Sequence, residues 1–328
     1  QMIIGRAGDL NNIKNHLINT NSIQVLTAIR GWPGVGKTTV AAALAHDPII
    51  VSTFRDGILW VSLGPAPSLI SELSTWGRAL GTNNILQAKS LQEASAQLAS
   101  LLRDKQMLLI VDDVWEPEHF LPFKVGGGKC STLITTRINS VAQAVAPKPA
   151  DIYKLAVLSD EKSLELLQTL APSVVSEHPR ESLDLVRQLE GLPLALQVAG
   201  HMLNAELGYG FDVANLLDEL KDGTKLLDSQ VPIELSDLAN QTTPTIMTLL
   251  KKSTDRLDEQ TRDYFAMLGP FAPKPSTFSL GTLKLVWQVD DPKPIIRILV
   301  DRGLLELVAG RYQIHSLLTL LAKSLLTS

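Results

Sequence analysis

The chain of 328 residues has one cysteine, few aromatic residues and no strong excess of either charge. Because Cys130 stands alone, an internal disulfide is excluded and the sequence fits a reducing compartment. No uninterrupted apolar run reaches membrane-spanning length, and no basic segment followed by an apolar one opens the chain. These absences predict a cytoplasmic protein with no membrane partner. Since Gln1 stands almost directly before a motif and is not Met, we expect a fragment of a longer protein.

The formal net charge of −4 argues against electrostatic binding of nucleic acid by the chain as a whole. From Ile246 onward, however, eleven Lys and Arg outnumber eight Asp and Glu, which makes this end weakly positive. The aromatic fraction of 5% predicts cores made mainly of Leu, Ile, Val and Ala. The histidines lack metal-ligand spacing, and neither a Ser-His-Asp arrangement nor a redox pair of cysteines can be argued.

The first half of the chain alternates short apolar runs with segments of helical spacing. Apolar runs of four to seven residues separated by helices are what a parallel sheet covered on both faces requires. We therefore predict a doubly wound α/β domain over residues 1–157. The predicted strands are Ile23–Ile29, Gly57–Leu63, Met107–Val111, Ser131–Thr135 and Ile152–Val157, and the predicted helices are Thr38–Ala45, Ser68–Leu80, Ser90–Arg103 and Ile138–Val145.

The second half has a different pattern. Residues 158–240 predict an all-α helical domain, with one helix ending before Gly191 and the next beginning at Pro193. Residues 241–328 predict a winged-helix domain. Its helices are expected at Ile246–Leu257, Glu259–Leu268, Leu280–Trp287, Pro294–Asp301 and from Ser316 onward, and a hairpin is expected across Ala309–Gly310.

The stretch "GWPGVGKTT" carries the first candidate site. Gly31, Gly36, Lys37 and Thr38 satisfy the phosphate-loop pattern G-x-x-x-x-G-K-[ST] between an apolar strand and a helix. Glycines, including Gly34, let backbone N–H groups wrap a phosphate, and the positive end of the helix points at the same anion. Lys37 would neutralise the terminal phosphates, and the Thr38 hydroxyl would complete a Mg²⁺ shell. A chance glycine turn is the alternative, and the flanking strand and helix argue against it.

Two further strand ends carry polar residues. "LLIVDDVW" ends an apolar strand with Asp112, which would hold Mg²⁺ through water, and Asp113, which would orient or deprotonate an attacking water. Asp113 could instead cap the following turn, and Trp115 is expected to be a packing or partly exposed residue and not a catalytic one. "STLITTR" ends another strand with Arg137, which should point toward the phosphates because ligands collect at the carboxyl ends of parallel strands. Considered alone, an arginine in the position of Arg137 is more often a surface salt-bridge residue.

Together with "GLPLA" at Gly191–Ala195, these motifs occur in the order and approximate spacing of the NB-ARC family. This family contains the apoptosis-type and plant-resistance-type ATPases of the signal-transduction class called STAND. "IIGR" at Ile3–Arg6 resembles the family's N-terminal element, and "YQIHS" at Tyr312–Ser316 resembles its Met-His-Asp element. The resemblance covers essentially the whole chain and suggests a bacterial-like fragment.

The resemblance implies a role for each matching position. Ile4 and Arg6 would border the base or ribose, Pro193 would pack on the adenine, and His315 would donate a hydrogen bond to the β-phosphate of ADP. The implied phosphate cradle consists of Gly34, Val35, Gly36, Lys37, Thr38 and Thr39. The catalytic set is Lys37, Asp112, Asp113 and Arg137, and the metal ligands are Thr38 and Asp112.

Two positions depart from the family pattern. The family usually has an acid soon after "GR", whereas here Ala7 and Gly8 precede Asp9. Ser316 stands where an Asp is typical after the histidine, so the restraint that this Asp provides is in question. Without the resemblance, the preferred interpretation of His315 is a wing-strand residue that packs near the hydrophobic junction.

The resemblance implies a switch that binds ADP or ATP with Mg²⁺. ADP would hold a closed monomer, exchange for ATP would open it for homo-oligomerisation, and slow ATP hydrolysis would reset it. C-terminal sensor repeats and an effector domain would lie outside this fragment. The alternative is a winged-helix DNA-binding transcriptional regulator with an ATPase module, although acidic residues surround its candidate recognition helix. A metabolic kinase is a third possibility, against which the two helical domains and the lack of an acceptor-pocket motif argue.

Overall fold

The computed structural model describes residues 3–19, 25–30, 34–208, 244–274 and 276–327. The chain forms two compact units. The first comprises Gln1–Trp32 and Gly36–Ala156, and the second comprises Pro33–Val35 and Val157–Ser328. Within the described residues, no helix is both long enough and apolar enough to cross a bilayer.

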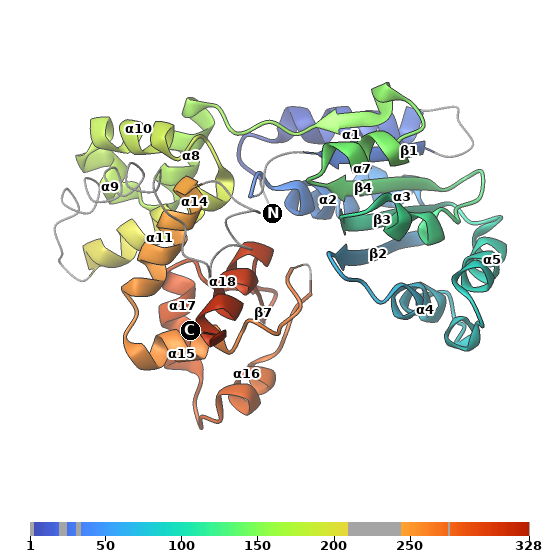
Figure 1. Cartoon of the computed structure of the whole chain (residues 1–328). Helices are drawn as coiled ribbons and strands as arrows, with labels where there is room; N and C mark the ends of the chain where they lie inside the picture. The colour runs from blue at the N-terminus through green and yellow to red at the C-terminus, as the bar shows by residue number, and fades with distance from the viewer. Residues whose placement is uncertain (1–2, 20–24, 31–33, 209–243, 275, 328) are drawn as a thin grey trace. The chain divides into compact units, whose positions relative to one another are not determined.

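The first unit is built around a parallel sheet of five strands in the order β2-β3-β4-β1-β5 (Figure 1). The strands are β1 (Val25–Arg30), β2 (Gly57–Gly64), β3 (Met107–Val114), β4 (Ser131–Thr136) and β5 (Ile152–Lys154). β3 and β4 pair in register from Leu108 with Ser131 to Val111 with Ile134, so their carboxyl ends lie at the same edge. This edge is where ligands of open α/β sheets bind.

Helices pack on both sides of this sheet (Figure 1). They are α1 (Ala7–Asn19), α2 (Lys37–Ala45), α3 (Pro48–Thr53), α4 (Leu69–Ala79), α5 (Leu91–Leu102), α6 (Pro117–Phe120) and α7 (Asn139–Val145). Local sequence explains where several of them begin: Asp47 accepts bonds from two N–H groups of α3, and Ser90 accepts one from Glu93 of α5. The rings of Trp76 and Phe123 pack edge to face, with their centroids 5.1 Å apart, in the apolar core beside β2 and β3.

The doubly wound parallel sheet is therefore as predicted, but several details differ from the sequence expectation. The sequence patterns predict no element at residues 7–19, 48–53 or 117–120, which form α1, α3 and α6. The last strand ends at Lys154 and not at Val157. The predicted first strand began at Ile23, which lies outside the described residues, and the described strand runs from Val25 to Arg30.

The first part of the second unit is helical, with no strand among the described residues 157–208. Its helices are α8 (Asp160–Leu170), α9 (Pro172–Glu177), α10 (Pro179–Gln188) and α11 (Pro193–Gly208). Gly191 lies between α10 and α11. Its φ of 63° is a left-handed backbone conformation that favours glycine. Its carbonyl accepts a hydrogen bond from Leu158 N at 2.9 Å. Pro193 stands at the first position of α11, as predicted.

The rest of the second unit combines short helices with one hairpin. The helices are α14 (Pro244–Asp255), α15 (Glu259–Ala266), α16 (Leu280–Trp287), α17 (Lys293–Asp301) and α18 (Ser316–Thr327). Strands β6 (Glu306–Val308) and β7 (Arg311–Gln313) pair antiparallel across Ala309 and Gly310. Both turn residues have positive φ, 50° and 76°, as a two-residue hairpin of this twist requires. The hairpin and these five helices therefore lie close to the predicted positions.

Candidate functional site

The described part of the phosphate loop leads directly into α2. Gly34 and Gly36 have φ values of 75° and 97°, a region in which a side chain is strained. Val35 between them is fully buried, which anchors the loop. Because Gly36 has no side chain, it cannot cap the first backbone N–H groups of α2, and such groups form a ready anion site at a helix N-terminus.

Lys37 begins α2 and is buried together with its ammonium group. The pKa of Lys37 is lowered to about 8, first by burial and then by the positive charge of Arg137, while Asp113 and Asp112 act in the opposite direction. Two cationic side chains are thus close enough to repel one another at the end of the sheet. An anion bound between them would relieve this repulsion.

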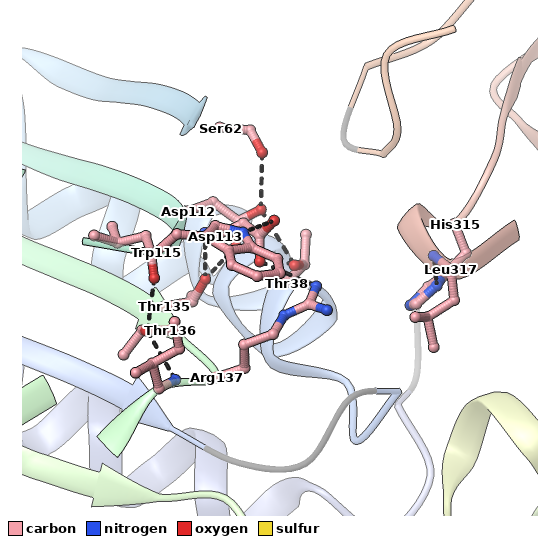
Figure 2. A network of polar contacts seen from close by, with 12 residues as sticks. Thr38, Ser62, Asp112, Asp113, Trp115, Thr135, Thr136, Arg137, His315 and Leu317 are labelled. Atoms are coloured by element: carbon pink, nitrogen blue, oxygen red, sulfur yellow. Dashed lines mark hydrogen bonds and ion pairs between the residues drawn. The ribbon is translucent and has the colours of Figure 1, made fainter. Parts of the chain in front are cut away.

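Asp112 ends the buried part of β3 and is surrounded by hydroxyl groups (Figure 2). The Thr38 hydroxyl lies 3.0 and 3.2 Å from its two carboxylate oxygens, the Ser62 hydroxyl lies 3.3 Å from Oδ2, and the Thr135 hydroxyl donates to Oδ1. The pKa of Asp112 is raised to about 6, mainly by burial and also by the charge of Asp113, although the hydroxyl bonds, above all that of Thr135, counteract the rise. Asp112 and Thr38 supply the hard oxygen ligands that Mg²⁺ prefers.

Asp113 follows in a left-handed conformation with φ 55°, and its backbone N–H donates to Thr135 Oγ1 at 2.9 Å. Its two carboxylate oxygens have different partners: Arg137 Nη2 donates to Oδ1 at 3.1 Å, and Trp115 Nε1 donates to Oδ2 at 3.0 Å. The Arg137 guanidinium carbon also lies 4.9 Å from the centre of the Trp115 ring. Trp115, expected from sequence to be a packing or partly exposed residue, is therefore part of the polar network in Figure 2.

The strand order explains why these side chains meet. β4 lies between β1, which precedes the phosphate loop, and β3, which carries Asp112. β3 and β1 are therefore separated by β4 alone, and the carboxyl end of β4 lies between the carboxyl ends of β3 and β1. This position brings Thr135 and Arg137 next to the two aspartates.

Arg6 is buried, with an exposed fraction of 3%, and contacts residues near the beginning and the end of the first unit. Its Nη1 donates to Asp9 Oδ2 at 3.0 Å and to the Ala156 carbonyl at 2.8 Å. Tyr153 donates its hydroxyl to the other Asp9 oxygen at 2.7 Å. Asp9 is therefore the acid that forms an ion pair with Arg6, although it comes two positions after Ala7 in the sequence. Ile4, two residues before Arg6, is half-buried.

Two predicted ligand residues belong to the second unit. Pro193 is half-buried at the start of α11. His315 precedes α18, and its Nδ1 accepts a hydrogen bond from Leu317 N at 3.2 Å. An Nδ1 atom that accepts in a neutral imidazole leaves the proton on Nε2, which becomes the donor. The roles of Pro193, His315 and Ile4 toward a nucleotide stay predictions.

Among the predicted site residues, the structure brings Lys37, Thr38, Asp112, Asp113 and Arg137 together in the first unit. Thr39 continues α2, next to Thr38. Sequence reasoning missed Ser62, Thr135 and Trp115 as members of the network. Each stands within or next to a recognised strand end, but which strand ends become neighbours is not encoded in any local pattern.

The glycine loop, the buried lysine, the hydroxyl–carboxylate pair and the parallel sheet together define a P-loop nucleotide-binding protein. The chain belongs to the NB-ARC family, whose domain model matches residues 6–175, and this confirms the family that the motifs resembled. The regulatory protein AfsR from Streptomyces coelicolor is 28% identical over 308 residues, which are 92% of this chain and 29% of that protein.

Other similar proteins come from animals, plants and archaea. Apoptotic protease-activating factor 1 from Rattus norvegicus is 29% identical over 58% of this chain and 16% of its own length. A probable disease resistance protein from Arabidopsis thaliana is 29% identical over 79% of this chain and 29% of its own length. The chain thus spans less than a third of the length of these curated relatives.

The fold resembles a solved Signal Transduction ATPase with Numerous Domains (STAND) protein with a tetratricopeptide repeat sensor, from Pyrococcus horikoshii. The likeness covers 98% of this chain and 42% of that chain, with a TM-score of 0.61 and 16% identity. At this identity the comparison supports the fold alone.

Proposed function

We propose that the chain is a nucleotide-controlled signalling switch that binds ADP and ATP together with Mg²⁺. The observation that carries this proposal is the contact of 3.0 Å between the Thr38 hydroxyl and the Asp112 carboxylate. It joins a hydroxyl from the first turn of the phosphate-loop helix to a carboxylate from a strand end, which is the oxygen pair that Mg²⁺ beside a nucleotide needs.

The phosphate loop and the other predicted ligands have complementary roles. The backbone N–H groups from Gly34 to Thr39 and the Lys37 ammonium would hold phosphates, and Arg137 would pair with the terminal one. Bound Mg²⁺ would supply positive charge to the phosphate oxygens. Ile4 and Arg6 would border the base or ribose.

The same geometry supports a slow ATPase. Asp113 is the candidate to orient or deprotonate water, yet both of its carboxylate oxygens already accept hydrogen bonds, one of them from a guanidinium. An attacking water would therefore compete with these two donors for the carboxylate. Slow turnover suits a switch, because the ATP state must persist long enough to transmit a signal.

The second unit would convert nucleotide identity into domain position. We assign residues 158–240 to a helical domain, in which Pro193 packs on adenine, and residues 241–328 to a winged-helix domain. Within the latter, His315 would donate from Nε2 to the β-phosphate of ADP, a role that the bond from Leu317 N to Nδ1 favours. ADP would hold the monomer closed, and ATP would open it for homo-oligomerisation, since each nucleotide would favour the shape that it binds better.

Release of bound nucleotide tests the proposal. Denaturing the purified chain should release ADP at about one molecule per chain, because a closed site traps its ligand. Lys37→Met should lose the nucleotide, whereas Lys14→Met should keep it, since Lys14 forms its ion pair with Asp47 and not with the loop. If the wild-type chain carries no adenine nucleotide and binds neither ADP nor ATP by calorimetry, the proposal is wrong.

Light scattering tests the assembly step. A non-hydrolysable ATP analogue should increase the molar mass of the chain, and ADP should not. His315→Ala should weaken ADP binding more than binding of the ATP analogue, because only the ADP state uses this histidine. Sensor repeats and an effector domain are expected outside these residues, and one similar structure carries a tetratricopeptide repeat sensor.

The DNA-binding alternative has weaker support. The candidate recognition helix α17 carries Lys293 and Arg297, but Asp290, Asp291 and Asp301 lie at its two ends. Useful affinity for DNA normally needs several cationic contacts to phosphates. Salt-dependent retardation of duplex DNA by the whole chain would favour the alternative.

A further inference from the structure

Asp113, Trp115 and Arg137 form a closed set of contacts, which we call the Arg137 bracket. Arg137 Nη2 donates to Asp113 Oδ1 at 3.1 Å, and Trp115 Nε1 donates to Asp113 Oδ2 at 3.0 Å. The guanidinium also stacks 4.9 Å from the centre of the Trp115 ring (Figure 2). Each member therefore contacts the other two.

The backbone holds this bracket at the edge where strand ends meet. Asp113 has φ 55°, which turns its carboxylate away from the regular alternation of β3. Its N–H donates to the Thr135 hydroxyl at 2.9 Å, so the turn is tied to β4. Arg137 directly follows β4, and its side chain is only 13% exposed.

The bracket restrains the Arg137 guanidinium through two kinds of contact. The Asp113 carboxylate supplies the opposite charge, and the face of the Trp115 ring supplies a second, cation–π contact.

We propose that Trp115 is a positioning residue that sets the preference of this site for ATP over ADP. It acts through Arg137: by holding both the guanidinium and the Asp113 carboxylate, it keeps Arg137 directed at the place of the terminal phosphate before the nucleotide binds. The inference rests on the proposed function of Arg137 as the contact to the γ-phosphate. Preorganisation of this kind increases affinity because less ordering is needed on binding.

Two substitutions separate the contributions of the ring and the indole N–H. Trp115→Leu removes both the stacked ring and the Nε1 donor, and should lower the ATP-analogue affinity relative to that of ADP by about tenfold. Trp115→Phe keeps an aromatic face and loses only the donor, so the ratio should fall by about threefold. ADP affinity itself should change little, because ADP lacks the phosphate that Arg137 serves.

Trp287→Phe is the matched control. It also removes one indole hydrogen bond, from Nε1 to the Tyr264 carbonyl at 2.8 Å in the second unit, and should leave the ratio unchanged. Calorimetric titration of the whole chain with ADP and with a non-hydrolysable ATP analogue gives both affinities. Circular dichroism checks folding, and if Trp115→Leu does not fold, the smaller Trp115→Phe effect carries the test.

A double mutant distinguishes positioning from general damage. In an Arg137→Ala background, Trp115→Leu should no longer change the ratio, because the residue that it positions is absent. A ratio that is unchanged in both Trp115 variants, or that falls equally with and without Arg137, overturns the inference while leaving the switch intact. If the wild-type chain binds neither nucleotide, the proposed function itself fails.

Discussion

Thr135 on β4 donates its hydroxyl proton to Oδ1 of Asp112 on the neighbouring strand β3. The same hydroxyl oxygen accepts the backbone N–H of Asp113 at 2.9 Å. One side chain therefore stabilises the buried carboxylate that would serve Mg²⁺ and also the backbone turn that directs Asp113 toward Arg137. The candidate metal ligand and the Arg137 bracket depend on the same threonine.

Thr135→Val should destabilise the site, because it removes both hydrogen bonds of the hydroxyl group. Since valine keeps the shape of the side chain, packing should change little. The Asp113 N–H and one Asp112 oxygen would each lose a partner, at a cost of about 1–3 kcal/mol in the free energy of opening of β3 and β4. Hydrogen exchange of the backbone amides in these strands measures this free energy. Thr135→Ser, which keeps the hydroxyl, should show a smaller effect. Equal exchange in wild type and Thr135→Val would contradict the bridging role.

Asp112 makes the stability of the nucleotide-free chain depend on pH. Its folded-state pKa of about 6 lies above the ordinary value of 3.8, so between these pH values the folded state holds a proton that the unfolded chain releases. This contribution to stability is complete below pH 3.8 and is lost as the pH rises through 6, with a slope on the order of 1.4 kcal/mol per pH unit.

Denaturation of wild type and Asp112→Asn between pH 4 and pH 7 checks this dependence, since Asn has nearly the same shape and does not titrate. The difference in free energy of unfolding between the two proteins should change with pH in the stated direction. Binding of Mg²⁺ with nucleotide should conversely weaken below pH 6, because a protonated Asp112 is a poor ligand. A constant difference across the range would show that Asp112 titrates normally.

We expect the Lys37 amine to take up a proton when a nucleotide binds. Its pKa of about 8 means that much of the lysine is neutral at pH 9 before binding, and phosphate oxygens favour the charged form. Calorimetry at pH 9 in two buffers of different ionisation enthalpy should show uptake approaching one proton per nucleotide. Lys37→Arg should remove the uptake, because arginine stays charged at this pH. Binding without proton exchange in the wild type would indicate an ordinary lysine.

We expect that adding a single methyl group at Gly191 lowers the stability of the protein strongly. A Cβ at this position would lie 2.2 Å from the Leu158 carbonyl oxygen, and the residue has φ 63°. Gly191→Ala should therefore destabilise the second unit by about 2–4 kcal/mol through strain and overlap. Gly8→Ala on α1 is the control: no heavy atom lies within 4 Å of its Cβ, and alanine should stabilise this helix by about 0.5–1 kcal/mol. Thermal denaturation of both variants measures the contrast.

Much of the fold was predictable because it depends on local patterns. The run Met107–Val111 is wholly apolar, as a buried parallel strand requires, and helix α11 begins at Pro193, where proline suits the first turn. Helix α1 was missed because Ala7–Asn19 has few apolar residues, and Ile13 and Leu17 mark the buried face only weakly. The two-residue turn at Ala309–Gly310 was visible from its glycine.

The amino-acid sequence by itself determined which chemical groups this protein offers for the proposed binding of phosphate and Mg²⁺, because the glycine loop, Lys37, Thr38 and Asp112 are specified by short-range spacing. Only the tertiary structure decided that Ser62, Thr135 and Trp115 join them. The physical reason is strand order: the crossover helices place β4 between β1 and β3 and put β2 beside β3, and no local pattern records which strand ends become neighbours.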